Sequence, residues 1–593
     1  MKAHLSIVAM LFILLPANTQ SQDIFRYAEA GDIDSLKSLL AVNPRLLESR
    51  DDNGKTVLSI AVQKGHAGLV KYLIARGADV NTHNNYGTTP LHYASYYGQR
   101  EIVRLLIEKK AQLDSHSEYV STPLFFAVTK GHADVARILI EAGAGVDIAD
   151  RQNKTPLHAA AQGGHVECVR LLLDAGADRT VITESGETIL HSACIGGKQE
   201  IVNQVADSAS TFGDRDNLGR TPLFDAAENG NAEVVNAIVA KTDPDFSLKC
   251  SDGSTYLHAA AEGGLKEFAA ALIDKGMSVN TENMFGLTPL DIATKKGNAE
   301  MSQLLKRHGA TIGSAPDSSG EYVDRHKPGL TPVLFAPGIV STPDFNERDV
   351  TFTPDGDELY FTRWPINNTW NIMVMKKQGS SWVHPQKASI ASDYVDAEAC
   401  VTHDGKKIFF ISNRPRSGAG SPESMEIWFA ARDGGGWSSP HLLGDKFKGG
   451  YYPTFTDSGT MYFTDAKSNI ARSQLVNGEY GDVLSLSDSV NTSASEYNSL
   501  IAPDESYLIF TSKGRGKGYG NDDLYISFRR TDGTWTEARN MGPRINSFAR
   551  EYCPALSHDG KYLFFCSTRL GTEDIWWVDA KCIEELKKSL NVE

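Results

Sequence analysis

The stretch Thr155-Pro156-Leu157-His158-Ala159-Ala160-Ala161-Gln162-Gly163-Gly164-His165 is one copy of a motif that recurs through the first half of the chain. Threonine followed by proline begins a helix, because threonine caps the first turn and proline at the first helical position gives up no hydrogen bond. The small alanines allow neighbouring helices to approach closely, and Gly163-Gly164 ends the helix. Residues Val166 to Leu173 place apolar side chains at helical spacing, which predicts a second helix.

The motif repeats with an almost fixed period. Copies begin at Thr56, Thr89, Thr122, Thr155, Thr188, Thr221, Thr255 and Thr288, at spacings of 33 residues with a single spacing of 34. A fixed period of this length predicts one helix pair stacked many times into a solenoid. A solenoid presents a long continuous surface without an enclosed pocket, so binding is the first expectation for this half.

The unit resembles the ankyrin repeat over about Asp23 to Gly313, and the turn Gly176-Ala177-Asp178 after the second helix is part of that likeness. Residues Ile24 to Leu47 keep the helix pair without the opening tetrapeptide, which predicts an N-terminal cap. The segment Gln204 to Ser210 departs from the pattern and predicts a local bend. The resemblance implies that a histidine shared by four units bonds to neighbouring backbone and binds no metal; these are His92, His158, His191 and His258.

The first residues predict an export signal. Lys2 and His4 precede an apolar run from Leu5 to Pro16, and the small, polar segment Ala17 to Gln22 follows. This order is typical of a secretory signal peptide, here residues 1–22, with cleavage close to Ser21 or Gln22. An uncleaved anchor is the alternative, although the run is shorter than the ~20 apolar residues of a membrane helix. We therefore expect a periplasmic or extracellular protein with no integral membrane segment after cleavage.

Composition limits the classes of function. The chain has 593 residues, 41% of them hydrophobic, a net charge of -15 and a mean hydropathy of -0.30. These values are typical of a folded multidomain protein, and the acidic balance argues against nucleic acid as a partner. Seven scattered cysteines without a Cys-x-x-Cys pair predict neither a disulfide framework nor a zinc site. We expect no metal and no cofactor.

Beyond Ser314 the sequence changes from helical to strand-like periodicity. A polar linker is predicted over 314–329, an all-β domain over 330–581 and a C-terminal helix over 582–593. Asp-Gly turns between alternating apolar residues predict hairpins, as at Asp355-Gly356, Asp404-Gly405 and Asp559-Gly560. Two weaker copies centre on Ser458-Gly459 and Asp504-Glu505. A third strand follows each turn, and a fourth is expected to begin near Trp382, Trp437, Tyr480 and Trp535.

Five such units at spacings of 46 to 55 residues predict the blades of a β-propeller. They resemble the WD-like Pro-Asp repeats of the TolB family, whose namesake has six blades, so six blades remain possible. The last unit lacks a fourth strand and Pro332 to Pro337 supplies a spare one, which predicts closure of the ring by both ends of the domain. The recurrent Trp382, Trp437 and Trp535 are expected to wedge between neighbouring blades. The fold class is thus an all-α ankyrin solenoid followed by an all-β propeller.

Four blades carry an acid at one repeat position, and glycine takes this place in the third blade. The acids are Glu347, Asp396, Glu496 and Glu551. A ring of carboxylates at the channel mouth can bind a cation or a sugar, or perform acid/base catalysis. The simpler interpretation pairs each acid with a base of its own repeat, namely Arg363, Arg414, Lys513 and Arg569. Separately, Cys553 and Cys566 flank the Asp559-Gly560 turn equally, which places them across the hairpin from each other. An oxidising compartment would permit a disulfide between them, although cross-strand geometry is often unfavourable for one.

A stripe of aromatic residues is the predicted docking surface. Tyr93, Tyr96 and Tyr97 occupy positions that the ankyrin resemblance places on the concave side of the first helix. Tyr86 and Phe126 extend the stripe, although such rings can also pack between repeats. Exposed aromatic rings in a groove are typical of protein interaction hot spots.

The chain contains no Gly-x-Ser-x-Gly elbow, phosphate loop, His-Glu-x-x-His motif or dinucleotide fingerprint. We therefore expect an exported adaptor or scaffold that binds a protein partner, rather than an enzyme. A carbohydrate-active hydrolase or sugar-binding protein that uses the propeller acids is the alternative, and a glycan or cell-envelope ligand remains possible. The sequence does not identify the partner.

Overall fold

The computed structural model describes residues 17–117, 121–206, 212–314, 318, 322–323, 327–365, 369–416, 424–516 and 518–589. The predicted signal peptide lies largely outside the described residues, and the first described element, α2 (Ala17–Ala30), includes the predicted cleavage position. Most of the predicted linker also lies outside them. Among the described helices, none combines the length and apolarity needed to span a membrane.

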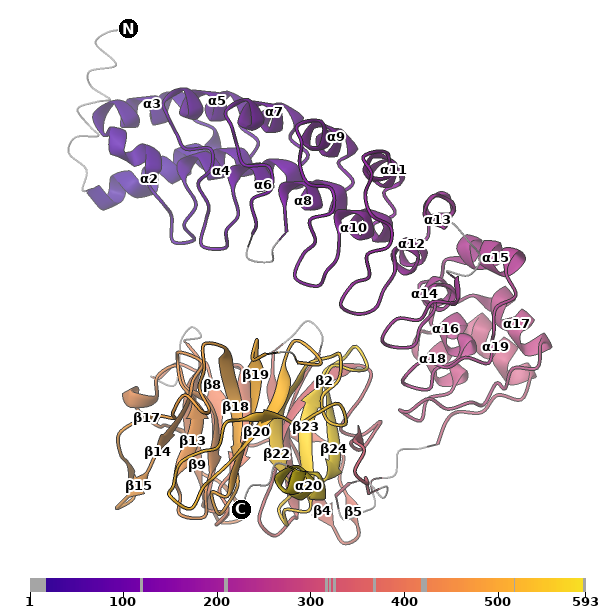
Figure 1. Ribbon diagram of the computed structural model, residues 1–593, viewed down its shortest axis with the longest axis vertical. Helices are drawn as coiled ribbons and strands as arrows, with labels where there is room; N and C mark the ends of the chain where they lie inside the picture. The colour runs from indigo at the N-terminus through magenta and orange to yellow at the C-terminus, as the bar shows by residue number, and fades with distance from the viewer. Residues whose placement is uncertain are drawn as a thin grey trace. The chain divides into compact units, whose positions relative to one another are not determined.

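The chain divides into two compact units, which are described one at a time. The first comprises residues 1–248, 256–277 and 296–304, and the second comprises 249–255, 278–295 and 305–593. The first unit holds the helical repeats (Figure 1), and the second holds the strands.

Each motif of the first unit opens a pair of helices. The first helices are α4 (Val57–Gln63), α6 (Pro90–Tyr96), α8 (Pro123–Thr129), α10 (Pro156–Gln162), α12 (Ile189–Gly196), α14 (Pro222–Glu228) and α16 (Tyr256–Glu262). The second helices are α5 (Ala67–Ala75), α7 (Arg100–Glu108), α9 (Ala133–Glu141), α11 (Val166–Asp174), α13 (Gln199–Val205), α15 (Ala232–Lys241) and α17 (Lys266–Asp274). A helix pair without the motif, α2 and α3 (Ile33–Val42), followed by η1 (Pro44–Glu48), precedes them. A last pair, α18 (Pro289–Lys295) and α19 (Ala299–Arg307), follows, with α18 assigned to the second unit.

The first helices line the inside of the solenoid's curve (Figure 1). The motif threonine begins each of them, and the Thr122 hydroxyl accepts a hydrogen bond from the Phe125 amide at 3.2 Å. The motif leucine of every repeat is buried, which holds the stack together. The irregular segment 204–210 falls partly outside the described residues, and α13 ends at Val205.

Two motif histidines, His92 and His191, link one repeat to the next, whereas the buried Nε2 atom of His158 has no hydrogen-bond partner among the described residues. In His92 one ring nitrogen accepts a hydrogen bond from the Thr89 amide at 3.1 Å, and the other lies 3.0 Å from the Ser121 carbonyl of the next repeat. His191 makes the equivalent contact with the Arg220 carbonyl at 3.2 Å. Burial lowers the pKa of His92 to about 4, so the ring is neutral. The prediction of backbone bonding is confirmed for these two histidines.

The second unit contains five antiparallel blades in a propeller-like arrangement. Blade 1 has β2 (Phe345–Phe352), β3 (Glu358–Pro365), β4 (Asn371–Gln378), β5 (Ser381–Trp382) and β6 (Gln386–Lys387); blade 2 has β7 (Asp396–Val401), β8 (Lys407–Ser412), β9 (Glu426–Asp433), β10 (Gly436–Trp437) and β11 (His441–Leu442). The 3-10 helix η3 (Asp445–Phe447) and blade 3 follow, with β12 (Tyr451–Phe455), β13 (Met461–Thr464), β14 (Ile470–Ser473), β17 (Leu484–Ser485) and the hairpin β15 (Leu475–Val476) and β16 (Glu479–Tyr480). Blade 4 has β18 (Ser495–Ile501), β19 (Tyr507–Lys513), β20 (Asp523–Phe528) and β21 (Arg539–Asn540). Blade 5 has β22 (Glu551–Leu556), β23 (Tyr562–Ser567), β24 (Asp574–Asp579) and β1 (Val333–Leu334), and α20 (Lys581–Ser589) ends the described chain.

Both ends of the domain close the ring, as predicted. Strand β1 pairs with β24, with Val333 opposite Trp577, so the first strand completes the last blade. This pairing removes the exposed edge of blade 5. Tyr322 lies in the segment predicted as linker, yet it is fully buried in the blade 1 and blade 5 core, and its hydroxyl donates to Asp559 at 2.6 Å.

Aromatic residues join neighbouring blades. The indole nitrogen of Trp437 donates to the Tyr360 hydroxyl at 2.8 Å, from blade 2 to blade 1. Trp535 meets Tyr462 edge to face, with 6.5 Å between ring centroids, from blade 4 to blade 3. Trp382 lies in the core cluster shared by blades 1 and 5. The predicted role of these tryptophans between blades is confirmed.

Every innermost strand carries a bulge centred on a non-glycine residue with left-handed backbone. These residues are Asp349 (φ 55°), Glu398 (φ 57°), Tyr452 (φ 53°), Asn498 (φ 48°) and Cys553 (φ 53°). The strand register shifts at each of these positions. Since a side chain other than glycine or asparagine rarely adopts this conformation, five occurrences at one repeat position are a built feature of the propeller.

Candidate functional site

The predicted aromatic stripe lies partly open on the first helices. Tyr86, Tyr96 and Tyr97 expose 50%, 37% and 47% of their surface. Tyr93 and Phe126 are half-buried. These five residues are called the tyrosine patch below.

Rings of two adjacent repeats meet in the tyrosine patch. Tyr96 at the end of α6 contacts Tyr97 edge to face, with ring centroids 5.0 Å apart, and Phe126 of α8 at 5.9 Å. The ammonium of Lys130 lies 4.7 Å from the Tyr96 ring centroid, a cation–π distance. These contacts fix the direction of the rings while leaving much of Tyr96 and Tyr97 open to a partner.

Tyr93 is held more firmly than the other tyrosines. Its hydroxyl accepts a hydrogen bond from the Asn84 side-chain amide at 3.0 Å, and Lys55 lies 5.8 Å from its ring centroid. Burial raises the pKa of Tyr93. The described contacts include no ring pair between Tyr86 and the rest of the patch. The structure therefore brings Tyr96 into direct contact with Tyr97 and Phe126. Tyr93 and Tyr86 are linked to each other through Asn84, whose side-chain oxygen accepts from the Tyr86 amide at 2.9 Å.

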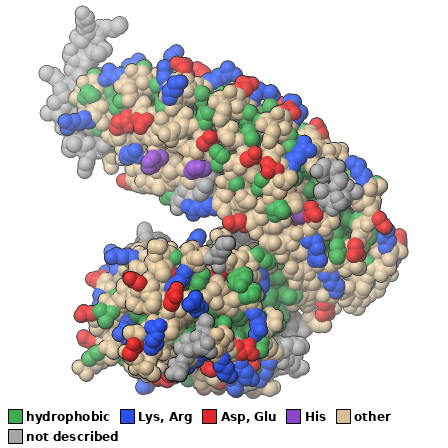
Figure 2. Space-filling model, in the orientation of Figure 1, with side chains coloured by type: hydrophobic (Ala, Val, Ile, Leu, Met, Phe, Trp, Pro, Cys, Tyr) green, Lys and Arg blue, Asp and Glu red, His purple; other side chains and the backbone are tan. Residues whose placement is uncertain are grey.

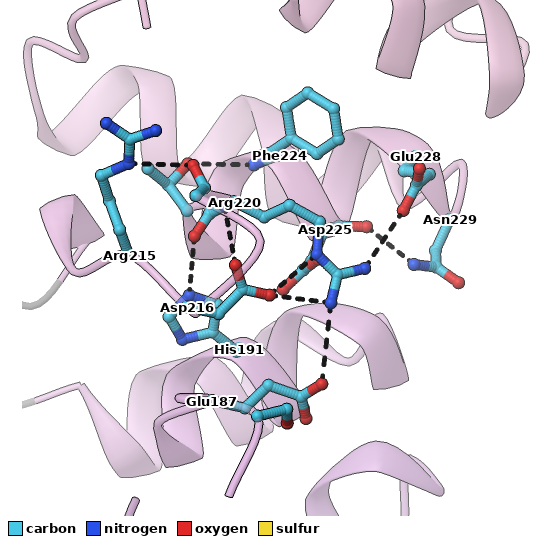
Figure 3. Close-up of polar contacts among 12 residues, drawn as sticks. Glu187, His191, Arg215, Asp216, Arg220, Phe224, Asp225, Glu228 and Asn229 are labelled. Atoms are coloured by element: carbon cyan, nitrogen blue, oxygen red, sulfur yellow. Dashed lines mark hydrogen bonds and ion pairs between the residues drawn. The ribbon is translucent and has the colours of Figure 1, made fainter. Parts of the chain in front are cut away.

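A second feature on the solenoid is a cluster of four acids around one arginine, shown in Figure 3. Arg220 lies 2.8 Å from Asp216, 3.5 Å from Asp225, and 3.7 Å from both Glu187 and Glu228. Asp225 and Glu228 belong to α14, a first helix like α6 and α8. The five residues are called the acidic cluster below. Its formal charge is negative, because a single guanidinium faces four carboxylates.

Asp225 is the most constrained member of the acidic cluster. Its carboxyl group is fully buried, and neither oxygen has a hydrogen-bond partner among the described residues. Burial raises the pKa of Asp225 well above its usual range, although Arg220 opposes the shift. Glu228 exposes 37% of its side chain, so the negative charge of the acidic cluster reaches the surface at this residue.

The four propeller acids do not reach solvent. Glu347, Asp396, Glu496 and Glu551 are each fully buried. Three of them pair with the predicted arginine, at 2.8 Å for Glu347 and Arg363, 2.6 Å for Asp396 and Arg414, and 3.1 Å for Glu551 and Arg569. Glu496 lies 3.6 Å from Arg515, so the predicted partner Lys513 was wrong.

Each of these acids also anchors the loop before its strand. Hydroxyl groups donate to them from Thr342 (2.9 Å), Ser392 (2.7 Å), Thr492 (2.6 Å) and Ser547 (2.6 Å). Burial raises the pKa of Glu347 to about 8 against the effect of Arg363. Donors within the same blade thus surround each acid, and the arrangement favours a structural role over an open carboxylate ring.

Among the described residues, the innermost strands of all five blades line two open cavities. One of about 460 Å³ is lined by residues such as Phe352, Val401 and Ile501. The other, of about 560 Å³, is lined by Arg348, Trp370, Tyr451, Tyr497, Arg550 and Tyr552. Bulge residues line both cavities, since Asp349 and Tyr452 face the first and Glu398 and Asn498 face the second.

The second cavity has a polar, aromatic lining that sequence reasoning missed. The Arg348 guanidinium lies 5.2 Å from the Trp370 ring centroid and 5.5 Å from that of Tyr552. Tyr451, Tyr497 and Tyr552 each directly precede a bulge residue, at one repeat position. The recurrence of tyrosine at one repeat position of three blades was the sequence signal that could have revealed this lining.

Comparison with known proteins agrees with the helical half. Residues 24–117, 113–183, 176–247 and 238–315 match the family described as "Ankyrin repeats (3 copies)". The N-terminal half consists of ankyrin repeats. The chain is 36% identical over 52 residues to alpha-latrotoxin-Lh1a of Latrodectus hasselti, covering 9% of this chain and 4% of the toxin. It is 36% identical over 85 residues to Rabankyrin-5 of Homo sapiens, covering 14% of this chain and 6% of that protein. The chain therefore matches only a small part of either relative.

Proposed function

We propose that this chain is an exported scaffold that binds a protein partner on the concave face of its ankyrin repeats. Ankyrin repeats imply protein–protein interaction, and the exposed rings of the tyrosine patch are the observation that supports this docking face. Tyr96 and Tyr97 combine high exposure with fixed ring directions, so little conformational entropy is lost when they bind. Buried aromatic anchors of this kind each contribute about 2 kcal/mol or more to binding.

The acidic cluster defines a second requirement of the partner. It lies on α14, on the loop before α14 and, through Glu187, on the loop before α12, in the same row of first helices as the tyrosine patch. A partner segment that carries an arginine or lysine would neutralise part of the charge excess around Arg220. A partner with an apolar anchor and a basic residue therefore fits this face best.

Charged side chains of both signs are interspersed on the surface that Figure 2 shows, and basic residues form no continuous field in that view.

The propeller serves as a second binding module in this proposal. Its likeness to TolB-type repeats supports an extracytoplasmic role, as does the apolar run from Leu5 to Pro16. The cavity lined by Arg348 and Tyr552 is the place where a small ligand or a peptide end would fit. The hydrolase alternative draws no support from the burial and ion pairing of Glu347 and its counterparts.

Site-directed photo-crosslinking tests the proposal. A photoreactive phenylalanine analogue placed at Tyr97 should capture a discrete partner from an extracytoplasmic extract. The same analogue at Tyr72, on the second helix α5, is the matched control because it also replaces a tyrosine of the solenoid. We expect a crosslinked band at position 97 and none at position 72. Equal crosslinking at both positions would show that the concave face has no special role.

A further inference from the structure

Two cysteines and one aspartate meet at the axis of the propeller. The Sγ atoms of Cys553 and Cys566 and a carboxylate oxygen of Asp349 all lie within 4.8 Å of one another. The three residues are 1%, 0% and 3% exposed, respectively. The set offers two sulfur atoms and one carboxylate oxygen in one buried place, and a buried charge is normally paired or coordinates a metal.

The bulges of two blades create this meeting point. Cys553 is the bulge residue of β22 in blade 5, and Cys566 lies on the neighbouring strand β23. Asp349 is the bulge residue of β2 in blade 1, which is adjacent because the ring closes there. The left-handed backbone at both bulges is strained for side chains of this kind, and strain of this type is concentrated at functional sites.

The surrounding groups carry an excess of negative charge. Arg348 donates to both oxygens of Asp349, at 3.1 and 3.2 Å, and to Glu398 at 2.5 Å. One guanidinium therefore neutralises only one of two buried carboxylates.

The thiols are suited to metal binding. Both are free, and the Asn498 amide donates to the Cys553 sulfur at 2.7 Å. A donor of this kind stabilises a thiolate once a cation has displaced its proton. Asp349 also lines the 460 Å³ cavity, which gives an ion a route to the site.

We infer that Asp349, Cys553 and Cys566 form a binding site for a thiophilic divalent cation such as Zn²⁺. Two thiolates and a carboxylate are ordinary zinc ligands, and three protein ligands leave the fourth position for water. The cation would join blade 5 to blade 1 at the closure of the ring. The competing interpretation is a disulfide between the two cysteines, which would exclude the metal.

Cobalt substitution tests the inference on the full chain. Reduced protein should bind one Co²⁺ per molecule and develop the charge-transfer absorption of a Co²⁺–thiolate bond, and Zn²⁺ should abolish it. Cys566→Ser and Asp349→Asn should each weaken Co²⁺ binding at least tenfold. Cys400→Ser is the matched control, because Cys400 lies on an innermost strand outside the cluster. Loss of the band in Cys400→Ser, or no band in the reduced wild-type chain, would overturn the inference.

Two measurements on the wild-type protein cover the case in which a variant fails to fold. X-ray absorption at the zinc edge of zinc-loaded protein should show sulfur scatterers at about 2.3 Å. A shell of only oxygen and nitrogen atoms would contradict the site. Mass spectrometry of protein purified without reductant should find both thiols free; a Cys553–Cys566 disulfide would favour the competing interpretation and overturn ours.

Discussion

The indole nitrogen of Trp437 donates a hydrogen bond to the hydroxyl of Tyr360 across the boundary between blades 2 and 1, at a distance of 2.8 Å. The equivalent pair two blades on, Trp535 and Tyr462, meets through ring edges 6.5 Å apart between centroids. The same repeat position thus joins blades by a polar contact in one place and by an apolar contact in another.

A double-mutant cycle measures this difference. Trp437→Phe and Tyr360→Phe should show a coupling of about 1 kcal/mol in the free energy of unfolding of the propeller, because both changes remove the same hydrogen bond. The cycle for Trp535→Phe and Tyr462→Phe should give a smaller coupling. Chemical denaturation followed by tryptophan fluorescence provides the four free energies of each cycle. Equal couplings in the two cycles would show that the hydrogen bond is not the source of the coupling energy between Trp437 and Tyr360.

Stability of the propeller should fall as pH rises from about 4 to about 7. Asp574 is fully buried, and burial raises its pKa to about 7 from an ordinary value of 3.8. Between these values the folded state holds a proton that the unfolded state has released, so unfolding becomes easier by up to about 1.4 kcal/mol per pH unit for this one group. Asp574→Asn should reduce that slope and stabilise the protein at pH 8. An unchanged slope in urea unfolding of the variant would contradict the assignment.

The acidic cluster predicts unequal responses to two substitutions. Arg220→Met removes the guanidinium that faces four carboxylates and should destabilise the ankyrin domain by about 3 kcal/mol. Asp225→Asn should cost less than about 1 kcal/mol or increase stability, because burial already raises the pKa of that carboxyl. Thermal unfolding by circular dichroism compares the two variants. A larger loss in Asp225→Asn than in Arg220→Met would show that Asp225 is ionised and essential to the fold.

Export predicts a processed N-terminus. The mature chain should begin close to Ser21 or Gln22, because the small, polar segment follows the apolar run there. N-terminal sequencing of the protein from the extracytoplasmic fraction checks this, and a chain that starts at Met1 would count against cleavage.

Much of the fold was predictable because its signals are local. The motif threonine and proline set where each first helix begins, as Thr122 shows at the start of α8. The Asp559-Gly560 turn predicted the last hairpin, and the spare strand near Val333 predicted the closure of the ring. Each of these features depends on a few adjacent residues, so no distant contact was needed to recognise it.

The sites were only partly predictable, because they depend on distant contacts. Exposure of Tyr96 and Tyr97 followed from their helical positions, but the contact between Cys553 and Asp349 joins two ends of the ring. The bulge residues share no chemistry, since Asp349, Tyr452 and Cys553 have in common only their repeat position and backbone conformation. The burial of Glu347 also could not be predicted from its position in the repeat. The loop that contains Thr342 folds over this carboxylate and donates a hydrogen bond to it.

The affinity of the crosslinked partner for tyrosine variants tests the central claim most directly. Isothermal titration of the purified partner into the Tyr96→Ala/Tyr97→Ala double variant should show at least a 100-fold loss of affinity, because two exposed ring anchors disappear. The unfolding midpoint should change little, since neither ring is part of the buried core and 37% of Tyr96 and 47% of Tyr97 is exposed. Tyr72→Ala, the control on the second helix row, should bind like the wild type. Unchanged affinity in the double variant, or a large drop in its unfolding midpoint, would contradict the assignment of the tyrosine patch as the docking surface.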